Sequence, residues 1–223
     1  PSFAWPDECG SGVTYCEQSE STGFRSLGEG WGRGAAWVDV DNDGWEDLFR
    51  SDSVGGYPEF PHLSVLFRNQ ADGGFVPFDL GIQPSHTNHN WSSVWADIDN
   101  DGDEDVFLVN GGFDGAAPSY LYRNDLAESG RFVDISASAG ISDAAHHWWG
   151  GAWADYDNDG YVDLVVTSVS GPSYEDPEVI EPGPTVLYRN LGDGRFEEIA
   201  DALGLPHDLG NAKDPVWLDY DHD

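Results

Sequence analysis

Basic residues and long apolar runs are scarce in this sequence, and each scarcity excludes a class of function. Lys and Arg number 9 against 42 Asp and Glu, which gives a formal charge of −33. Nucleic-acid binding needs a basic surface, and electrostatic docking to anionic lipid needs clustered Lys and Arg. No run of 18 or more apolar residues is present. We therefore expect no nucleic-acid partner and no direct membrane insertion.

Methionine is absent, and cysteine nearly so. The chain starts at Pro1 without a visible signal peptide, so we expect a processed product or a fragment of a longer protein. Cys9 and Cys16 are the only cysteines. Their spacing favours a short local disulfide, formed in an oxidising compartment, over two free thiols. A metal site is disfavoured because no His lies near them.

Aromatic residues and turn formers, by contrast, are abundant. Acidic chains poor in Lys are often disordered, but that class is also poor in aromatic residues. This chain has 10 Trp, 11 Phe and 9 Tyr, enough to build a core. Its 28 Gly and 13 Pro indicate many turns, which favours an all-β fold.

A repeat runs through the chain. An acidic motif follows Trp-x-Asp in WVDVDNDGWEDLF, WADIDNDGDEDVF and WADYDNDGYVDLV, and a shorter copy reads WLDYDHD. The leading aspartates are Asp39, Asp97, Asp155 and Asp219, spaced by 58, 58 and 64 residues. Between them recur LFRN or LYRN and then a Gly-aromatic pair. Each unit is therefore expected to form four short strands, with the acidic loop between the first and second.

Tandem four-stranded units of this length predict a β-propeller, with a stacked solenoid as the alternative architecture. The first strand of each unit is rich in small residues, which suits a position near the crowded central axis. We predict an N-terminal segment over 1–22, blades over 23–80, 81–138 and 139–202, and the start of a fourth blade over 203–223. About three blades are thus present, fewer than the four to eight of a closed propeller.

The acidic loops have the composition of calcium sites. Numbered from the leading Asp, they place carboxylates at positions 1, 3, 5 and 9 and Gly at position 6, where a positive φ closes the loop. The backbone carbonyl at position 7 would add one oxygen. Oxygen-only ligation of this number selects Ca²⁺ over Mg²⁺. The predicted ligands are Asp39, Asp41, Asp43, Trp45 and Asp47; Asp97, Asp99, Asp101, Asp103 and Asp105; and Asp155, Asp157, Asp159, Tyr161 and Asp163.

Two other interpretations of these loops fit the sequence less well. An EF-hand needs a bidentate Glu at position 12, where this chain has Arg50, Leu108 or Val166, so that interpretation fails. A single DNDG is an ordinary turn sequence. Three full copies and one shorter copy in one register favour calcium, at about one ion per complete loop.

With these motifs, the chain resembles the FG-GAP/VCBS-type repeats, which form the blades of integrin α-subunit propellers and occur in many secreted bacterial proteins. The resemblance covers about residues 23–223 and rests on DxDxDGxxD after Trp-x-Asp, with LYRN and GDGRF. It implies a propeller, often seven-bladed, with calcium in the loop between the first two strands of each blade. It also implies that Asp219, Asp221 and Asp223 begin a fourth ligand set.

Aromatic and basic residues gather where the chain enters each first strand. If equivalent positions converge near the channel mouth, they would form a ligand-binding face suited to a glycan or peptide. The alternative is aromatic packing and loop hydrogen bonding. The residues of this predicted face are Trp31, Arg33, His89, Trp91, His147 and Trp149.

The resulting hypothesis is a calcium-stabilised propeller segment, secreted or in the cell envelope, that serves as a protein- or glycan-binding adhesion scaffold. The alternative is part of a secreted enzyme, for example one acting on polysaccharide, with its chemistry on the His-rich entry loops or outside this chain. No nucleophile elbow, phosphate loop or zinc-protease helix is present. No catalytic residue is therefore assigned.

Overall fold

The computed structural model describes residues 32–52, 64–83, 86, 90–111, 116–141, 144–172, 180–181, 183–205 and 212–219. Several positions singled out above lie outside these residues: Cys9, Cys16, Trp31, His89, Asp221 and Asp223. The predicted disulfide and the predicted ligands Asp221 and Asp223 of the fourth acidic loop therefore stay predictions.

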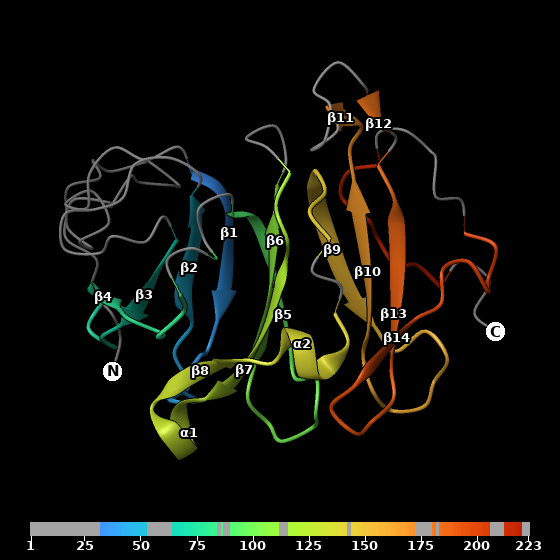
Figure 1. Cartoon of the computed structure of the whole chain (residues 1–223). Helices are drawn as coiled ribbons and strands as arrows, with labels where there is room; N and C mark the ends of the chain where they lie inside the picture. Colours follow the sequence, from blue (N-terminus) through green and yellow to red (C-terminus); the bar gives the residue numbers. More distant parts are fainter. Residues whose placement is uncertain are drawn as a thin grey trace.

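Three four-stranded antiparallel sheets stand side by side and make up most of the described structure (Figure 1). Each sheet runs in chain order from its first to its fourth strand, as the repeat predicts. The all-β prediction is thus confirmed, and the sheets form an open array of propeller-like blades. The strands are β1 (Gly32–Val38), β2 (Asp47–Asp52), β3 (Val65–Asn69) and β4 (Phe75–Phe78); β5 (Asn90–Ala96), β6 (Asp105–Asn110), β7 (Tyr120–Asp125) and β8 (Arg131–Asp134); and β9 (Trp148–Ala154), β10 (Asp163–Ser168), β13 (Thr185–Asn190) and β14 (Phe196–Glu198).

Two short helices and a two-stranded ribbon accompany the second and third blades. Two four-residue helices, α1 (Leu126–Ser129) and α2 (Ser136–Ala139), flank β8 in the second blade. A two-stranded ribbon, β11 (Gly171–Pro172) with β12 (Ile180–Glu181), follows β10 in the third. Among the residues that the structure describes, no helix is long and apolar enough to cross a membrane.

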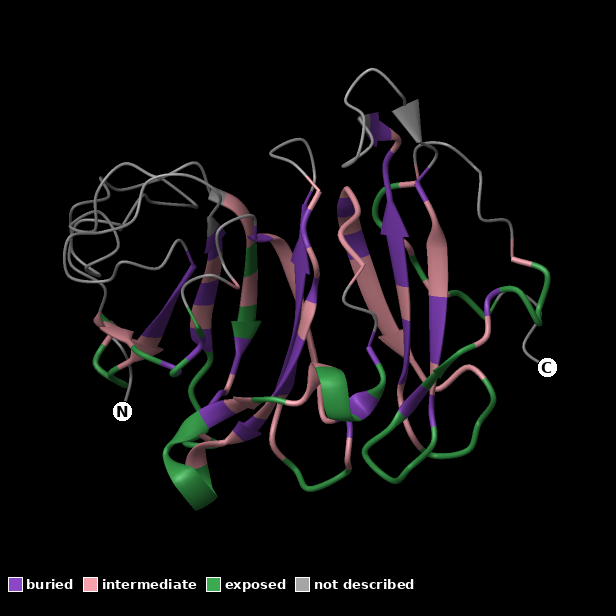
Figure 2. Cartoon of the chain, in the orientation of Figure 1, coloured by how far each residue is buried: buried purple, intermediate pink, exposed green. Residues whose placement is uncertain are grey.

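The core lies between the blades, and β6 shows why. All six residues of β6 are buried, so the strand contacts a neighbour on both faces (Figure 2). Val106 and Leu108 belong to the cluster shared with the first blade, whereas Phe107 and Val109 belong to the cluster shared with the third. Alternate side chains of a strand point to opposite faces, so a continuous apolar run is what a central blade requires.

The first strands lie close to one another, which explains their small residues. A Cβ added at Gly34 of β1 would lie 3.4 Å from the carbonyl oxygen of Trp91 in β5. At Gly151 of β9, an added Cβ would lie 3.3 Å from a methyl group of Val94 in β5. Larger side chains would push neighbouring blades apart, so the small-residue pattern reflects close packing of β1, β5 and β9.

Candidate functional site

The three acidic loops, loop 1 (39–47), loop 2 (97–105) and loop 3 (155–163), lie at the same end of the sheets, below the arrowheads of β1 and β9 in Figure 1. In loop 2 the carboxylate of Asp97 accepts hydrogen bonds from the N–H groups of Asp101 at 3.1 Å and Gly102 at 2.9 Å. The position-1 carboxylates of the other two loops accept the same pair of bonds. The side chain of each leading Asp therefore holds its own loop in a tight turn by hydrogen bonds to two backbone N–H groups.

Two residues in the left-handed backbone conformation also contribute to the tight turn of each loop. Gly102 at position 6 has φ +96°, and Asn100 at position 4 has φ +61°. An added Cβ at Gly102 would meet nothing within 4 Å, so glycine is required there by its backbone conformation rather than by space. Asn is among the few residues other than Gly that adopt this region readily. Loops 1 and 3 have the same two conformations.

The position-9 aspartates are buried and tie each loop to its own blade. Asp105 is 1% exposed, and its two oxygens accept from the N–H of Ile98 in loop 2 at 3.0 Å and of Asn124 in β7 at 2.7 Å. Asp47 and Asp163 make the equivalent pairs of bonds. Since position 9 is the first residue of the second strand, this carboxylate joins the loop to the second and third strands.

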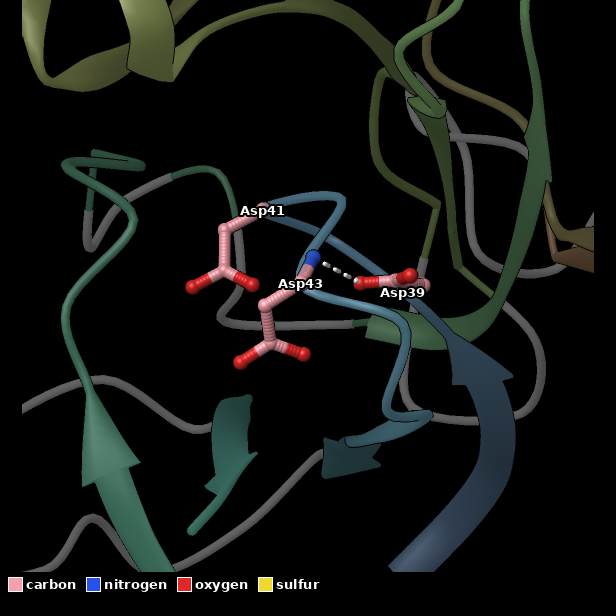
Figure 3. A group of neighbouring side chains, drawn as sticks. All are labelled: Asp39, Asp41 and Asp43. Carbon is pink, nitrogen blue, oxygen red and sulfur yellow. Dashed lines mark hydrogen bonds between the residues drawn. The ribbon is translucent and has the colours of Figure 1, made fainter. Parts of the chain in front are cut away.

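Each loop brings carboxylate oxygens from three aspartates to within 4.8 Å of one another. Figure 3 shows the three aspartates of loop 1. In loops 1 and 2 one oxygen at position 3, Asp41 Oδ1 or Asp99 Oδ1, is buried without a hydrogen-bond donor. A buried acceptor without a donor is costly unless a cation satisfies it, so the residues present fit a hard divalent ion. The grouped aspartates are Asp39, Asp41 and Asp43; Asp97, Asp99 and Asp101; and Asp155, Asp157 and Asp163.

The carboxylates are electrostatically crowded. Burial, and then the charges of Asp99 and Asp101, raise the pKa of Asp105 to about 7, despite two stabilising backbone hydrogen bonds. Burial likewise raises the pKa of Asp47 to about 6. Burial and the neighbouring Asp101 raise the pKa of Asp99. A bound cation would offset this repulsion and favour the ionised carboxylates.

The arginine of each LFRN or LYRN motif forms an ion pair with an acidic side chain of its own blade. Arg68 pairs with Asp41 at position 3 of loop 1. Arg123 forms a two-pronged pair with Asp125, and Arg189 pairs with Glu197. Of these three arginines, Arg68 is therefore the one that pairs with a carboxylate of an acidic loop.

The predicted ligand face is only partly described, and what is described forms a stack. The guanidinium of Arg33 lies 4.3 Å from the ring centroid of Trp91, and the Trp91 and Trp149 rings lie 4.5 Å apart. The ammonium of Lys213 lies 4.6 Å from the Trp149 ring. Arg33, Trp91, Trp149 and Lys213 thus form a cation–tryptophan stack that runs from the first blade to the segment 212–219. Its role in ligand binding stays a prediction.

A repeated irregularity positions this stack. The pairing register of β1, β5 and β9 shifts in each case around one unpaired residue, which is Arg33, Trp91 or Trp149. Such a bulge redirects the side chain of the extra residue. Each of the four stack residues lies six positions before its leading Asp, Lys213 included, and this shared offset is the sequence signal that would have identified Lys213.

His147 takes no part in the stack contacts given above. Its ring packs over Gly171, where an added Cβ would lie 2.1 Å from the imidazole. Because His89 lies outside the described residues, the suggested convergence of the two histidines stays a prediction. Asp219 is described and exposed, whereas Asp221 and Asp223 are not described. Carbonyl ligation by Trp45, Asp103 and Tyr161 stays a prediction as well.

Comparison with known families accounts for the repeat. Two tandem matches to the model of the FG-GAP-like repeat cover residues 39–108 and 97–166, together more than half of the chain. The chain belongs to the FG-GAP-like repeat family. Both matches start at a leading Asp and end within a second strand of the following blade, so this repeat unit contains one complete acidic loop and the next.

Curated relatives of this FG-GAP-like repeat protein are longer than the chain. Cartilage acidic protein 1 of Xenopus tropicalis is 29% identical over 193 residues, which cover 85% of this chain and 28% of the relative. The proteins of the same name from Mus musculus and Homo sapiens are each 44% identical over 55 residues, which cover 25% of this chain and 8% of the relative. The chain therefore spans less than a third of the length of the relatives it matches.

Proposed function

We propose that this chain is a calcium-stabilised, extracellular FG-GAP-like repeat module that serves as a binding scaffold. The observation that carries the proposal is that each of the three loops gathers carboxylate oxygens of three aspartates within 4.8 Å of one another. In loops 1 and 2, one oxygen of the position-3 carboxylate is also buried and accepts no hydrogen bond. In each loop, carboxylates at positions 1, 3, 5 and 9 and the absence of His and Cys favour a hard cation with many oxygen ligands, which is Ca²⁺ rather than Mg²⁺. The bound ion would neutralise the crowded carboxylates and hold each loop closed.

The expected size of the effect follows from mass action. Extracellular calcium modules bind with dissociation constants of about 10⁻⁴ to 10⁻³ M. At calcium tenfold above the tighter limit, each site stabilises the fold by about 1.4 kcal/mol, and three sites by about 4 kcal/mol. Stabilisation of this size is a large part of the net stability of an ordinary domain.

Thermal unfolding of chelator-treated protein tests this proposal. We expect the midpoint to rise as calcium is added from micromolar to millimolar concentrations, and to respond little to magnesium. An unchanged midpoint with both ions would overturn the calcium proposal and leave the loops as ordinary turns.

An extracellular setting is consistent with the proposed calcium role and with the relatives. Sites with the affinity of extracellular modules, as assumed above, would be filled at millimolar calcium and nearly empty in the cytosol. The relatives named Cartilage acidic protein 1 take their name from a tissue rich in extracellular matrix.

For the partner, the proposed contact surface is the cation–tryptophan stack, which contains two of the nine basic residues of the chain. Aromatic rings beside cations suit a glycan or an acidic peptide segment. A microarray of neutral and sulfated oligosaccharides tests the glycan case: we expect retention by the wild type, loss in W149A, and no change in W37A, whose Trp is 60% exposed and outside the stack. Equal retention by both variants would argue against this surface.

A further inference from the structure

We infer that neighbouring calcium sites are coupled through asparagine side chains, so that an ion in one loop strengthens binding in the next. The inference rests on the calcium binding proposed above. It adds a regulatory property, positive cooperativity along the blades, and assigns positioning roles to asparagines that are not themselves in the predicted ligand set.

The first link between loops is the asparagine at position 4. The side-chain Nδ2 of Asn42 in loop 1 donates to the carbonyl oxygen of Gly102 in loop 2 at 3.1 Å and to Asp103 Oδ1 at 2.5 Å. Asn100 of loop 2 repeats this contact with the carbonyl oxygen of Gly160 in loop 3, at 3.0 Å. Each asparagine lies between the position-3 and position-5 carboxylates of its own loop, so it moves with two predicted ligands.

These bonds reach the peptide unit that orients a ligand in the next loop. The carbonyl of Gly102 and the N–H of Asp103 belong to one peptide unit, and that N–H donates to Asp101 Oδ1 at 3.0 Å. Asn42 therefore hydrogen-bonds the peptide unit whose N–H donates to the position-5 carboxylate of loop 2. The peptide between Gly160 and Tyr161 connects Asn100 to Asp159 in the same way, with an N–H to oxygen distance of 2.9 Å.

A second asparagine closes each link from the opposite side. Asn124 in β7 donates through Nδ2 to the carbonyl oxygen of Val40 in loop 1 at 2.9 Å, while its backbone N–H donates to Asp105 at position 9 of loop 2. Asn190 in β13 joins Ile98 of loop 2 to Asp163 of loop 3 in the same manner. Both asparagines are 1% exposed, so these bonds are shielded from water.

Coupling between the sites is expected because an ion bound in one loop would order part of the next loop. An ion in loop 1 immobilises the segment that contains Val40 and Asn42, and this segment holds backbone and carboxylate positions of loop 2. The ordering of loop 2 is then partly complete before its own ion arrives, which lowers the entropic cost of binding. Coupling between two sites commonly amounts to about 5-fold or more in affinity.

The test compares variants that change the same backbone position. Asn42, Asn100 and Asn158 all have φ between 55° and 61°, so Gly replaces each without conformational strain and removes the side chain with its amide. N42G/N100G deletes both position-4 links. N158G is the matched control, because loop 3 has no complete following loop in the described part of the chain. Calcium binding is followed by isothermal titration calorimetry of the full chain after chelator treatment.

We expect the wild type and N158G to titrate with a Hill coefficient above 1. For N42G/N100G we expect a Hill coefficient lower than that of the wild type, because the links through Asn124 and Asn190 remain, and a raised half-saturating calcium concentration. Equal titration curves for N42G/N100G and N158G would overturn the coupling while leaving calcium binding intact. Absence of calcium uptake by the wild type would overturn both proposals, so the two failures are distinguishable.

Discussion

Asp105→Ala lowers the free energy of unfolding in saturating calcium by roughly 3 to 6 kcal/mol, because two losses combine. The variant loses a position-9 ligand and with it the contribution of the second ion. It also leaves the N–H groups of Ile98 and Asn124 without their acceptor, at a position that is 1% exposed. Chemical denaturation at millimolar calcium measures the difference from wild type.

The matched control for this variant is D101A. Asp101 belongs to the same loop and is also a predicted ligand, but it is exposed and accepts the N–H of Asp103. D101A should therefore lose about 1.4 kcal/mol, the calcium contribution of one site, and little more. If D105A is no less stable than D101A in calcium, the buried position-9 carboxylate does not have the structural role described here.

D105A also tests how the stability of the metal-free protein depends on pH. The pKa of Asp105 in the folded chain is about 7, above its ordinary value of 3.8, so the folded state binds this proton more tightly than the unfolded state does. Stability from this group is therefore lost as pH rises from about 4 to 7. Chelator-treated wild type should unfold at a lower temperature at pH 8 than at pH 5, and D105A should show a smaller fall. A metal-free wild type that gains stability over this range would contradict the pKa assignment.

Asn124→Ala should have the second large effect, a loss of about 2 to 4 kcal/mol. The substitution leaves the carbonyl of Val40 unsatisfied at a position that is 1% exposed, and removes the weaker bond to Glu104. It therefore removes a hydrogen bond between the first two blades at their acidic ends, beside the predicted ligands. Urea unfolding in calcium measures the loss, and N190A should lose a similar amount at the next interface.

The chain supplies its own control in Asn69, the equivalent residue of the first blade. Its amide donates to the carbonyl of Glu46 in its own loop, and the described residues contain no earlier blade for it to reach. N69A should therefore cost about 1 kcal/mol, the value of an ordinary hydrogen bond. Equal losses for N69A and N124A would show that the contact between blades adds nothing.

Features that depend on local sequence could be predicted before the structure. The four-strand unit follows from turn residues and apolar runs, and the positive φ of Gly102 follows from its place in DNDG. The continuous run at β6 could likewise be predicted as a strand. The two helices that flank β8 were not predicted, because each is a single turn of four residues and is too short to show a helical periodicity in the sequence.

Contacts between blades could not be predicted in the same way. Asn190 and Ile98 are 92 residues apart in the chain, and Asn124 and Val40 are 84 apart. No local pattern shows which carbonyl such an amide will meet. The bulges that bring Arg33, Trp91 and Trp149 into one stack also depend on how the first strands pack. The sequence alone therefore does not show which of the aromatic and basic residues before each first strand will meet.

Equilibrium dialysis of the chelator-treated chain against radioactive calcium tests the central claim most directly. At millimolar calcium we predict about three bound ions per chain, one for each described acidic loop, with about one fewer in D101A. Binding that is absent, or that is the same in wild type and D101A, would contradict the assignment of the acidic loops as calcium sites.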